Sequence, residues 1–108
     1  METPAAIYQV ENKHIQILRV NAVFYTMFAA HFDHSKSLEL SQQKNLPKES
    51  LEVIQNAFQE VLKTKHPVCC FFPLSDSQGH LLNIRMSLRY WGLNQTASII
   101  FAQYFTQD

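Results

Sequence analysis

The sequence predicts an α+β fold in which the strands form an antiparallel sheet. Residues alternate between apolar and polar from Leu81 to Trp91, and the side chains of a strand switch faces at every residue. One face of this strand is therefore apolar and the other mostly polar, as in an antiparallel sheet that is covered on one side. A helix with an apolar stripe begins near Pro47, before this strand, and another strand-like segment, Thr96 to Thr106, follows it.

The composition fits one globular domain. A chain of 108 residues with 46% hydrophobic content is long enough for one core, and its net charge of zero argues against a nucleic-acid surface. No apolar run approaches the length of a membrane span, and no secretory signal is visible. Cys69 and Cys70 are adjacent, which fits no zinc spacing and disfavours a disulfide between them. We therefore expect a single cytoplasmic domain over residues 1–108, with reduced thiols and no metal.

The chain is predicted to begin with a β-hairpin. Ala5 to Val10 and Ile15 to Val20 are short apolar segments that flank four polar residues. The alternation in the second segment places Ile15, Ile17 and Arg19 on one face.

A short helix and a long helix are predicted next. Asn21 is a typical N-cap residue, and apolar residues at helical spacing indicate a helix over Ala22 to Ala30. His31 to Leu46 is polar and weakly patterned. Pro47 fits the first position of the long helix. The apolar stripe of that helix consists of Leu51, Ile54, Phe58 and Val61, widened by Ala57 and Leu62.

The long helix is predicted to end before Pro67, because the residue preceding a proline avoids the helical region. Val68 to Phe72 is an apolar strand, and Ser75 to Gly79 is a polar turn whose glycine tolerates positive φ. After the alternating strand, the chain is predicted to reverse over Gly92 to Gln95. Both glycines of the sequence thus stand at predicted reversals.

The order of these elements resembles that of a PAS domain. Ile17 to Phe24 resembles the family's second strand running into its first helix, where an Asn and then an aromatic residue are typical. Ser75 to Gly79 resembles its polar hairpin turn, and Leu93 to Asp108 resembles its last loop and strand. The resemblance implies a five-stranded antiparallel sheet of order 2-1-5-4-3, with helices packed on one face.

The resemblance also implies a function. PAS domains are sensory modules of longer signalling proteins, so the chain is expected to be one module of a multidomain protein and not an enzyme. It would bind a small apolar ligand, or relay a signal to an attached histidine kinase, diguanylate cyclase or DNA-binding domain. Such modules serve two-component systems and transcription regulation.

No cofactor is expected from the sequence. Some PAS domains hold haem through a histidine on or near the long helix, but His66 stands at the helix end beside Pro67 and is predicted to face solvent. Light-sensing members carry a flavin and a reactive cysteine in an Asn-Cys-Arg-Phe-type helix motif, which this sequence lacks. The other histidines are His14, His31, His34 and His80.

Large apolar residues are candidates either for a ligand pocket or for a filled core. Small-ligand pockets are mostly apolar with a few placed polar groups, so both interpretations fit the same residues. Trp91 is one aromatic candidate for this space. The predicted pocket residues are Phe24, Phe28, Ile54, Phe58, Phe72, Ile84, Met86 and Tyr90.

The last strand is apolar on both faces. One face must meet the core, and a large exposed apolar patch usually marks an interface. The outer sheet face of PAS domains often dimerises or packs on a flanking helix. We therefore predict a homodimer through this surface, with the alternative that the patch is covered only in the longer protein. The predicted interface residues are Trp91, Ile99, Phe101 and Phe105.

Two other functions stay open. A small isomerase or dehydratase needs a carboxylate or histidine inside its pocket, and only Asp33 and His34 are candidates to reach one. The inward row of Leu81 to Trp91 carries no acid, histidine or cysteine, so no catalytic site is expected there. The second alternative is a ligand-free interaction scaffold with a solid core.

Overall fold

The structure is a computed structural model that describes residues 3–12, 14–28, 47–75 and 79–107. Five strands and two helices are described, and no described helix is long and apolar enough to cross a membrane. In chain order the elements are β1 Ala5–Glu11, β2 His14–Val20, α1 Ala22–Phe28, α2 Lys48–Thr64, β3 Val68–Ser75, β4 Leu81–Asn94 and β5 Ala97–Gln107.

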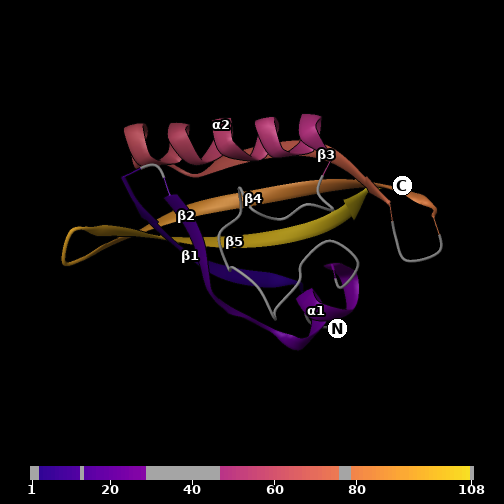
Figure 1. Cartoon of the computed structure of the whole chain (residues 1–108), viewed down its shortest axis with the longest axis horizontal. Coiled ribbons are helices and arrows are strands. Elements are labelled where there is room, and N and C mark those ends of the chain that lie inside the picture. The colour runs from indigo at the N-terminus through magenta and orange to yellow at the C-terminus, as the bar shows by residue number, and fades with distance from the viewer. Residues whose placement is uncertain (1–2, 13, 29–46, 76–78, 108) are drawn as a thin grey trace.

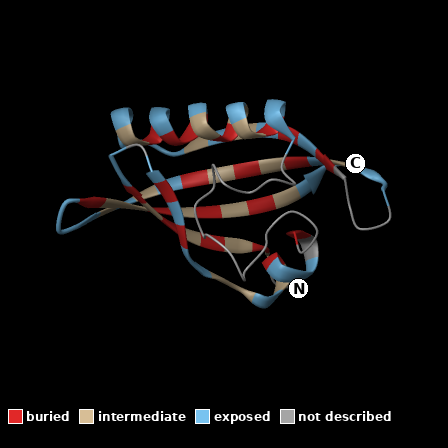
Figure 2. Cartoon of the chain, in the orientation of Figure 1, coloured by how far each residue is buried: buried red, intermediate tan, exposed pale blue. Residues whose placement is uncertain are grey.

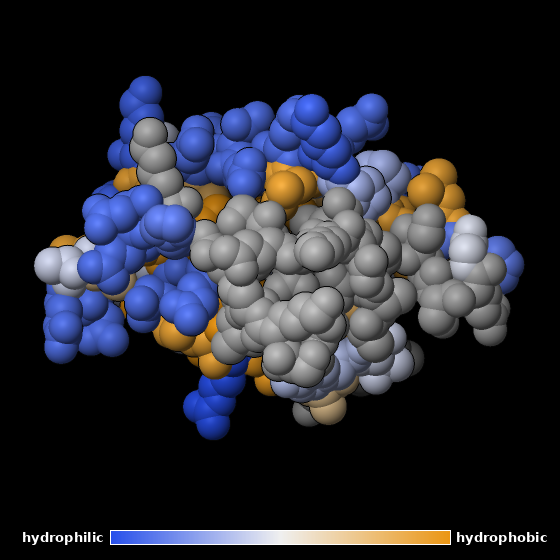
Figure 3. Space-filling view, viewed as in Figure 1, coloured by the Kyte–Doolittle hydropathy of each residue, from blue (hydrophilic) through white to orange (hydrophobic). Residues whose placement is uncertain are grey.

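The strands form one antiparallel sheet of order β2-β1-β5-β4-β3, which confirms the predicted topology. Helix α2 lies along the β3–β4 side of this sheet, as Figure 1 shows. Its outward side is hydrophilic in Figure 3. Its buried residues, Ser50, Ile54, Ala57, Phe58 and Val61, include most of the predicted apolar stripe.

The core lies between the helices and one face of the sheet, which we call the inner face. Buried and half-buried residues alternate along much of β1, β4 and β5 in Figure 2. The predicted inward row of β4 is confirmed, because Ile84, Met86 and Leu88 are completely buried. The opposite face, which we call the outer face, carries the half-buried and exposed residues of the same strands.

Two β-bulges change the predicted register. In β1–β2, Ile7 pairs with Arg19 and Tyr8 with Ile17, so Leu18 is the extra residue. Because a bulge reverses the alternation, Arg19 lies on the outer face with Ile7 and not on the face of Ile17.

The second bulge lies in β4 at Trp91, since Tyr90 pairs with Ile100 and Gly92 with Ile99. Gly92 therefore stands inside the strand, with φ of 126°, and not in a reversal as predicted. The chain reverses later, at Gln95 and Thr96. Glycine suits this position because L side chains rarely adopt such a φ value.

The helix ends show how local sequence fixes the elements. The predicted N-cap is confirmed, because Asn21 Oδ1 accepts hydrogen bonds from the backbone N–H of Phe24 at 3.0 Å and of Ala5 at 3.1 Å. Pro47 is the N-cap of α2 and not its first residue. Lys65, in the left-handed conformation, ends α2 two residues before Pro67.

Candidate functional site

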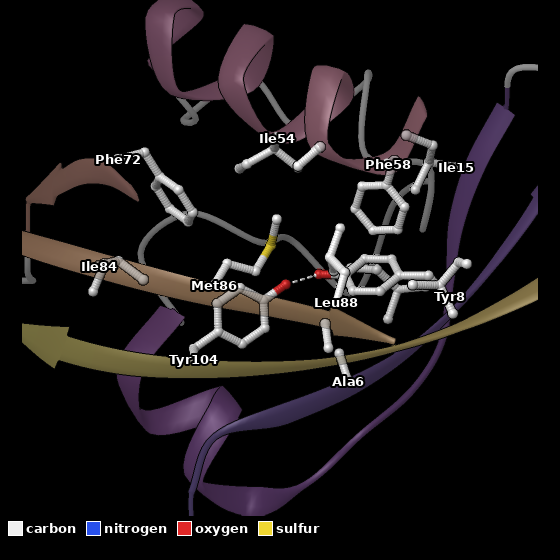
Figure 4. Close-up of a cluster of buried hydrophobic side chains, with 14 of the residues drawn as sticks. Ala6, Tyr8, Ile15, Ile54, Phe58, Phe72, Ile84, Met86, Leu88 and Tyr104 are labelled. Atoms are coloured by element: carbon white, nitrogen blue, oxygen red, sulfur yellow. Dashed lines mark hydrogen bonds between the residues drawn. The ribbon is translucent and has the colours of Figure 1, made fainter. Parts of the chain in front are cut away.

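The eight residues predicted to line a pocket come together in one region of the core. Seven of them are buried members of a single cluster, and Tyr90 packs against it. Figure 4 shows two side chains pointing from α2 to the sheet, Ile54 toward Met86 and Phe58 toward Tyr8. Whether these residues surround a ligand or simply fill the core stays a prediction.

Two tyrosine hydroxyl groups meet inside this core, which the sequence analysis missed. Tyr8 of β1 and Tyr104 of β5 are hydrogen-bonded through their Oη atoms, and their side chains are almost completely buried. Phe58 meets the Tyr8 ring edge-to-face at a centroid distance of 4.9 Å, and Phe28 meets the Tyr104 ring at 4.9 Å. A tyrosine at an inward position was the available signal, because its buried hydroxyl requires a partner.

Within the described residues, the hydroxyl pair leaves one hydrogen without an acceptor. Two O–H groups carry two hydrogens, and their mutual bond uses one. No acceptor for the second is found among the described residues. Desolvation by burial raises the pKa of Tyr8, with a smaller opposing effect of the hydrogen bond to Tyr104. Burial likewise raises the pKa of Tyr104, so both hydroxyls are neutral at ordinary pH and one can donate to a ligand.

The other buried polar side chain already has its partner. Ser50 of α2 donates from Oγ to the carbonyl oxygen of Pro73 in β3, at 2.7 Å. This bond attaches the start of α2 to the edge strand. The tyrosine pair is therefore the feature of the described core that has hydrogen-bonding capacity left.

A hollow of about 260 Å³ opens between α2 and the β1–β2 hairpin. It shares Phe58 with the predicted pocket, and Phe58 contacts the Tyr8 ring. The volume lies slightly below that of sites for drug-sized molecules, which is about 300 Å³ or more, so it suits a small ligand. The hollow is lined by Val10, Ile15, Gln55, Phe58, Gln59 and Leu62.

The candidates for catalysis and metal binding do not form a site in the described structure. Asp33 and His34 lie outside the described residues, as does His31. His66 is exposed, as predicted. Over residues 3–12, 14–28, 47–75 and 79–107, no three His, Cys, Asp or Glu side chains are grouped to hold a metal ion.

The two cysteines are free and point to opposite faces of β3. Cys69 is exposed on the outer face, whereas Cys70 is half-buried against the core. Burial, with a smaller effect from Cys69, raises the pKa of the Cys70 thiol to about 11. A raised pKa disfavours the thiolate, so Cys70 has the character of a packing residue and not of a nucleophile.

Trp91 lies on the outer face and not in the interior, because it follows the inward-facing Tyr90 in the strand and side chains switch faces at every residue. It is 57% exposed, and its ring stacks on that of Phe101 at 4.8 Å and 10°. Ile99, Phe101 and Phe105 are half-buried on the same face. The structure thus brings the four predicted interface residues to one face, while their role in dimerisation stays a prediction.

The fold matches solved structures, although the sequence matches no protein-family model and no curated protein. The Rhodobacter sphaeroides LOV protein matches with a TM-score of 0.67 and 8% identity, over 100% of this chain and 62% of that one. The Drosophila melanogaster Cycle PAS-B domain with bound ethylene glycol matches with a TM-score of 0.65 and 10% identity, over 94% of this chain and 99% of that one. A LOV domain described with a flavin analogue matches with a TM-score of 0.66 and 8% identity, over 99% of this chain and 78% of that one.

These matches have two consequences. The chain spans about three fifths of the length of the first LOV proteins it resembles, with 60% and 58% of two of them covered. At such low identity, the likeness shows the fold and does not assign a ligand.

The expectation of no cofactor is wrong. The structural neighbours include LOV domains, one of them described with a flavin analogue, so the missing cysteine motif does not exclude flavin from this fold. A flavin ring carries several polar groups that a protein must pair. The buried polar side chains of the described core are Tyr8, Tyr104 and Ser50, and they do not supply that set. No flavin chemistry is therefore assigned to these residues.

Proposed function

The chain has the fold of a PAS domain, and on that premise we propose that it is a non-catalytic sensory module. In this proposal a small, largely apolar ligand binds between the helices and the inner face of the sheet. The conformational change that the ligand causes passes through the sheet to a protein partner, or to an effector domain of the same parent chain. The free cysteines fit a reducing compartment, so we place the module in the cytoplasm.

The Tyr8–Tyr104 pair is the observation that carries this proposal. An apolar core gains little from a buried polar pair, because burying hydroxyl groups costs free energy unless they are fully hydrogen-bonded. One hydrogen of the pair has no acceptor among the described residues. A ligand with an apolar body and one carbonyl, ether or carboxyl oxygen would accept that hydrogen.

Strand β5 offers a route from the interior to the outer face. Tyr104 is buried on the inner face, and the next residue, Phe105, lies on the outer face. A ligand that shifts the tyrosine ring by acting on its hydroxyl would therefore move the backbone that also holds Phe105 and Phe101. We propose the outer face as the surface that passes the signal on.

The same proposal includes a protein partner that binds the outer face. The sequence predicts a second copy, held through Trp91, Ile99, Phe101 and Phe105, or an attached effector such as a histidine kinase, diguanylate cyclase or DNA-binding domain. An exposed Trp91 stacked on Phe101 at a sheet face supports a protein contact of some kind.

Native mass spectrometry tests the ligand half of the proposal. Purified wild-type protein is expected to carry an additional non-covalent mass that disappears in a denatured reference. The Tyr8→Phe/Tyr104→Phe variant, which keeps both rings and removes both hydroxyls, should lose that mass, whereas Tyr25→Phe on the exposed side of α1 should keep it. Equal retention by all three proteins would contradict the role of the hydroxyl pair. A wild type that carries no ligand would favour the scaffold alternative.

A further inference from the structure

The described core offers very few polar atoms to a ligand. Ser50 already donates its hydroxyl hydrogen to the carbonyl oxygen of Pro73. The thiol of Cys70 is half-buried and is only a weak hydrogen-bond donor. Among the side chains of the described core, the hydroxyl groups of Tyr8 and Tyr104 are therefore the strong donors that a ligand between the helices and the inner face would meet.

The described arginines and histidines lie away from this core. Arg19 stands opposite Ile7 on the outer face, and Arg85 and Arg89 stand opposite Phe105 and Phe101 on the same face. Three described histidines are all exposed: His14, His66 and His80. None of these residues therefore supplies a positive charge to the described part of the core.

One described lysine contacts a residue of the inner face, but at some distance from the tyrosine pair. The Nζ of Lys65 lies 4.2 Å from the centre of the Tyr90 ring and donates to the carbonyl oxygen of Leu62 at 2.6 Å. Tyr90 stands opposite Ile100, which stands opposite Tyr8, so two strand spacings, about 10 Å, separate the backbones of Tyr90 and Tyr8. The other described lysines, Lys48 and Lys63, are exposed on α2.

Such a core distinguishes neutral ligands from charged ones. A carboxylate that leaves water for an apolar interior loses its hydration, and only a cation or several hydrogen bonds compensate for that loss. The tyrosine pair supplies one hydrogen. Burial raises the pKa of both tyrosines, so the pair stays protonated and acts as a neutral donor. A ketone or ester carbonyl, which is uncharged, is satisfied by that single donor.

The surroundings of the hydroxyl pair narrow the class further. Phe28 meets the Tyr104 ring and Phe58 meets the Tyr8 ring, each at a centroid distance of 4.9 Å. Phe24 lies 5.6 Å from the Tyr104 ring. A carbonyl beside the pair thus has apolar neighbours, which suits a group within a carbon chain. A primary amide would bring two N–H donors into a core whose described side chains offer them only phenol oxygens and sulfur atoms.

We propose that the tyrosine pair makes the interior selective for a neutral ketone or ester with an apolar chain, and that the interior rejects the carboxylate of the same size. This inference deepens the proposed function and depends on it, because it names the chemical class of the ligand that the sensory module binds. The hydroxyl hydrogen that is not used within the pair is donated to the carbonyl oxygen. Both hydroxyl hydrogens then have an acceptor.

Three probes of matched size test this selectivity: methyl hexyl ketone, heptanoate, and the alkene in which a methylene group replaces the ketone oxygen. They share one alkyl chain and differ only at the carbonyl carbon. The full chain is titrated with each probe at pH 7 and followed by NMR. The ketone is expected to shift the signals of Tyr8 and Tyr104, but not that of Trp91 on the outer face.

The charge of the probe should dominate its affinity. The wild type is expected to bind the ketone at least about a hundredfold more tightly than heptanoate, because the carboxylate finds no cation beside the tyrosine pair. The methyl ester of heptanoate lacks the charge and should bind within about tenfold of the ketone. This comparison needs no variant.

A variant without the two hydroxyls tests the hydrogen bond. In Tyr8→Phe/Tyr104→Phe, the ratio of ketone affinity to alkene affinity should fall by at least about fivefold relative to the wild type. The hydration of the probes cancels in this comparison, because the same two probes are used with both proteins. Tyr25→Phe, on the exposed side of α1, should keep the wild-type ratio. Circular dichroism confirms that each variant is folded.

The outcomes separate this inference from the proposed function. Heptanoate that binds as tightly as the ketone, or an affinity ratio that the double variant leaves unchanged, would overturn the selectivity. Shifts confined to Trp91 and its neighbours would place the probes on the outer face and overturn it as well. If no probe binds while native mass spectrometry finds a ligand, the proposed function stands and the ketone or ester class is wrong. If no probe binds and the native protein carries no ligand, both fail.

Discussion

The hydroxyl groups of Tyr8 and Tyr104 are hydrogen-bonded in the core, although 96 positions of sequence separate the two residues. The pairing of β1 with β5 makes this possible, because it places Ala6 opposite Ala102 and brings the inward rows of the two strands side by side. The first and last strands of the domain therefore share a polar contact as well as backbone hydrogen bonds.

Removing both hydroxyls should cost less than the sum of the costs of removing each one alone. Tyr8→Phe or Tyr104→Phe leaves the other hydroxyl buried without its partner, at a cost of about 1–3 kcal/mol in the free energy of unfolding. The double variant replaces the pair by apolar groups of the same shape and should lose clearly less than the sum of the two single variants. Urea denaturation of the four proteins measures this coupling, and simple additivity would show that the two hydroxyls do not interact.

Stability should fall at high pH. Burial raises the pKa of both tyrosines above the ordinary value of 10.0, so the folded state holds their protons more tightly than the unfolded state. Their contribution to stability is therefore complete below pH 10 and is lost as the pH rises above it. The free energy of unfolding should decline there by up to about 1.4 kcal/mol per pH unit for each tyrosine. The double phenylalanine variant should show a shallower decline, and an equal decline would assign the effect to other groups.

The two thiols should react at different rates. Cys69 is exposed, whereas Cys70 is half-buried with a pKa raised to about 11, so little of it is thiolate at pH 8. Iodoacetamide should modify Cys70 at least about tenfold more slowly than Cys69. Mass spectrometry of Cys69→Ser and Cys70→Ser proteins separates the two rates, and comparable rates would mean that β3 opens readily from the core.

Asn21 should contribute more to the free energy of unfolding than an ordinary N-cap residue does. Its Oδ1 accepts from two backbone N–H groups, and its Nδ2 donates to the Thr3 carbonyl oxygen at 2.8 Å, so it joins α1 to the start of the chain. Asn21→Ala should cost about 2 kcal/mol in unfolding free energy, and Asn21→Asp less, because it keeps the acceptor. Asn56→Ala on the exposed side of α2 is the control and should stay within about 0.5 kcal/mol. A cost no larger than that of the control would refute the bridging role.

Local patterns predicted much of the fold. The alternation of Leu81 to Trp91 identified the inward residues of β4, and the polar side chain of Asn21 identified the start of α1. Both signals are local, since they depend on side-chain periodicity and on one capping group. The strand order, in contrast, came from the resemblance to PAS domains and not from any pattern within the chain.

Other features depend on how the strands are aligned with each other, and they could not be predicted from the sequence. The bulge at Trp91 inserts one residue, which no alternation of apolar and polar residues reveals in a segment as apolar as Tyr90 to Leu93. The tyrosine pair requires knowledge of which residues of β1 and β5 stand side by side. The candidate pocket residues are apolar side chains that share one core, and their role in a ligand pocket stays a prediction.

The strand order also constrains how the domain folds during synthesis. The chain folds into two hairpins, β1–β2 and β3–β4, and within the described sheet the only strand that pairs with both is β5. On the ribosome, the two halves therefore have no shared strand partner until the last eleven residues of the sheet have emerged. The module becomes one cooperative unit only when its final strand closes the gap, so truncations within 97–107 should leave a chain that aggregates or is degraded.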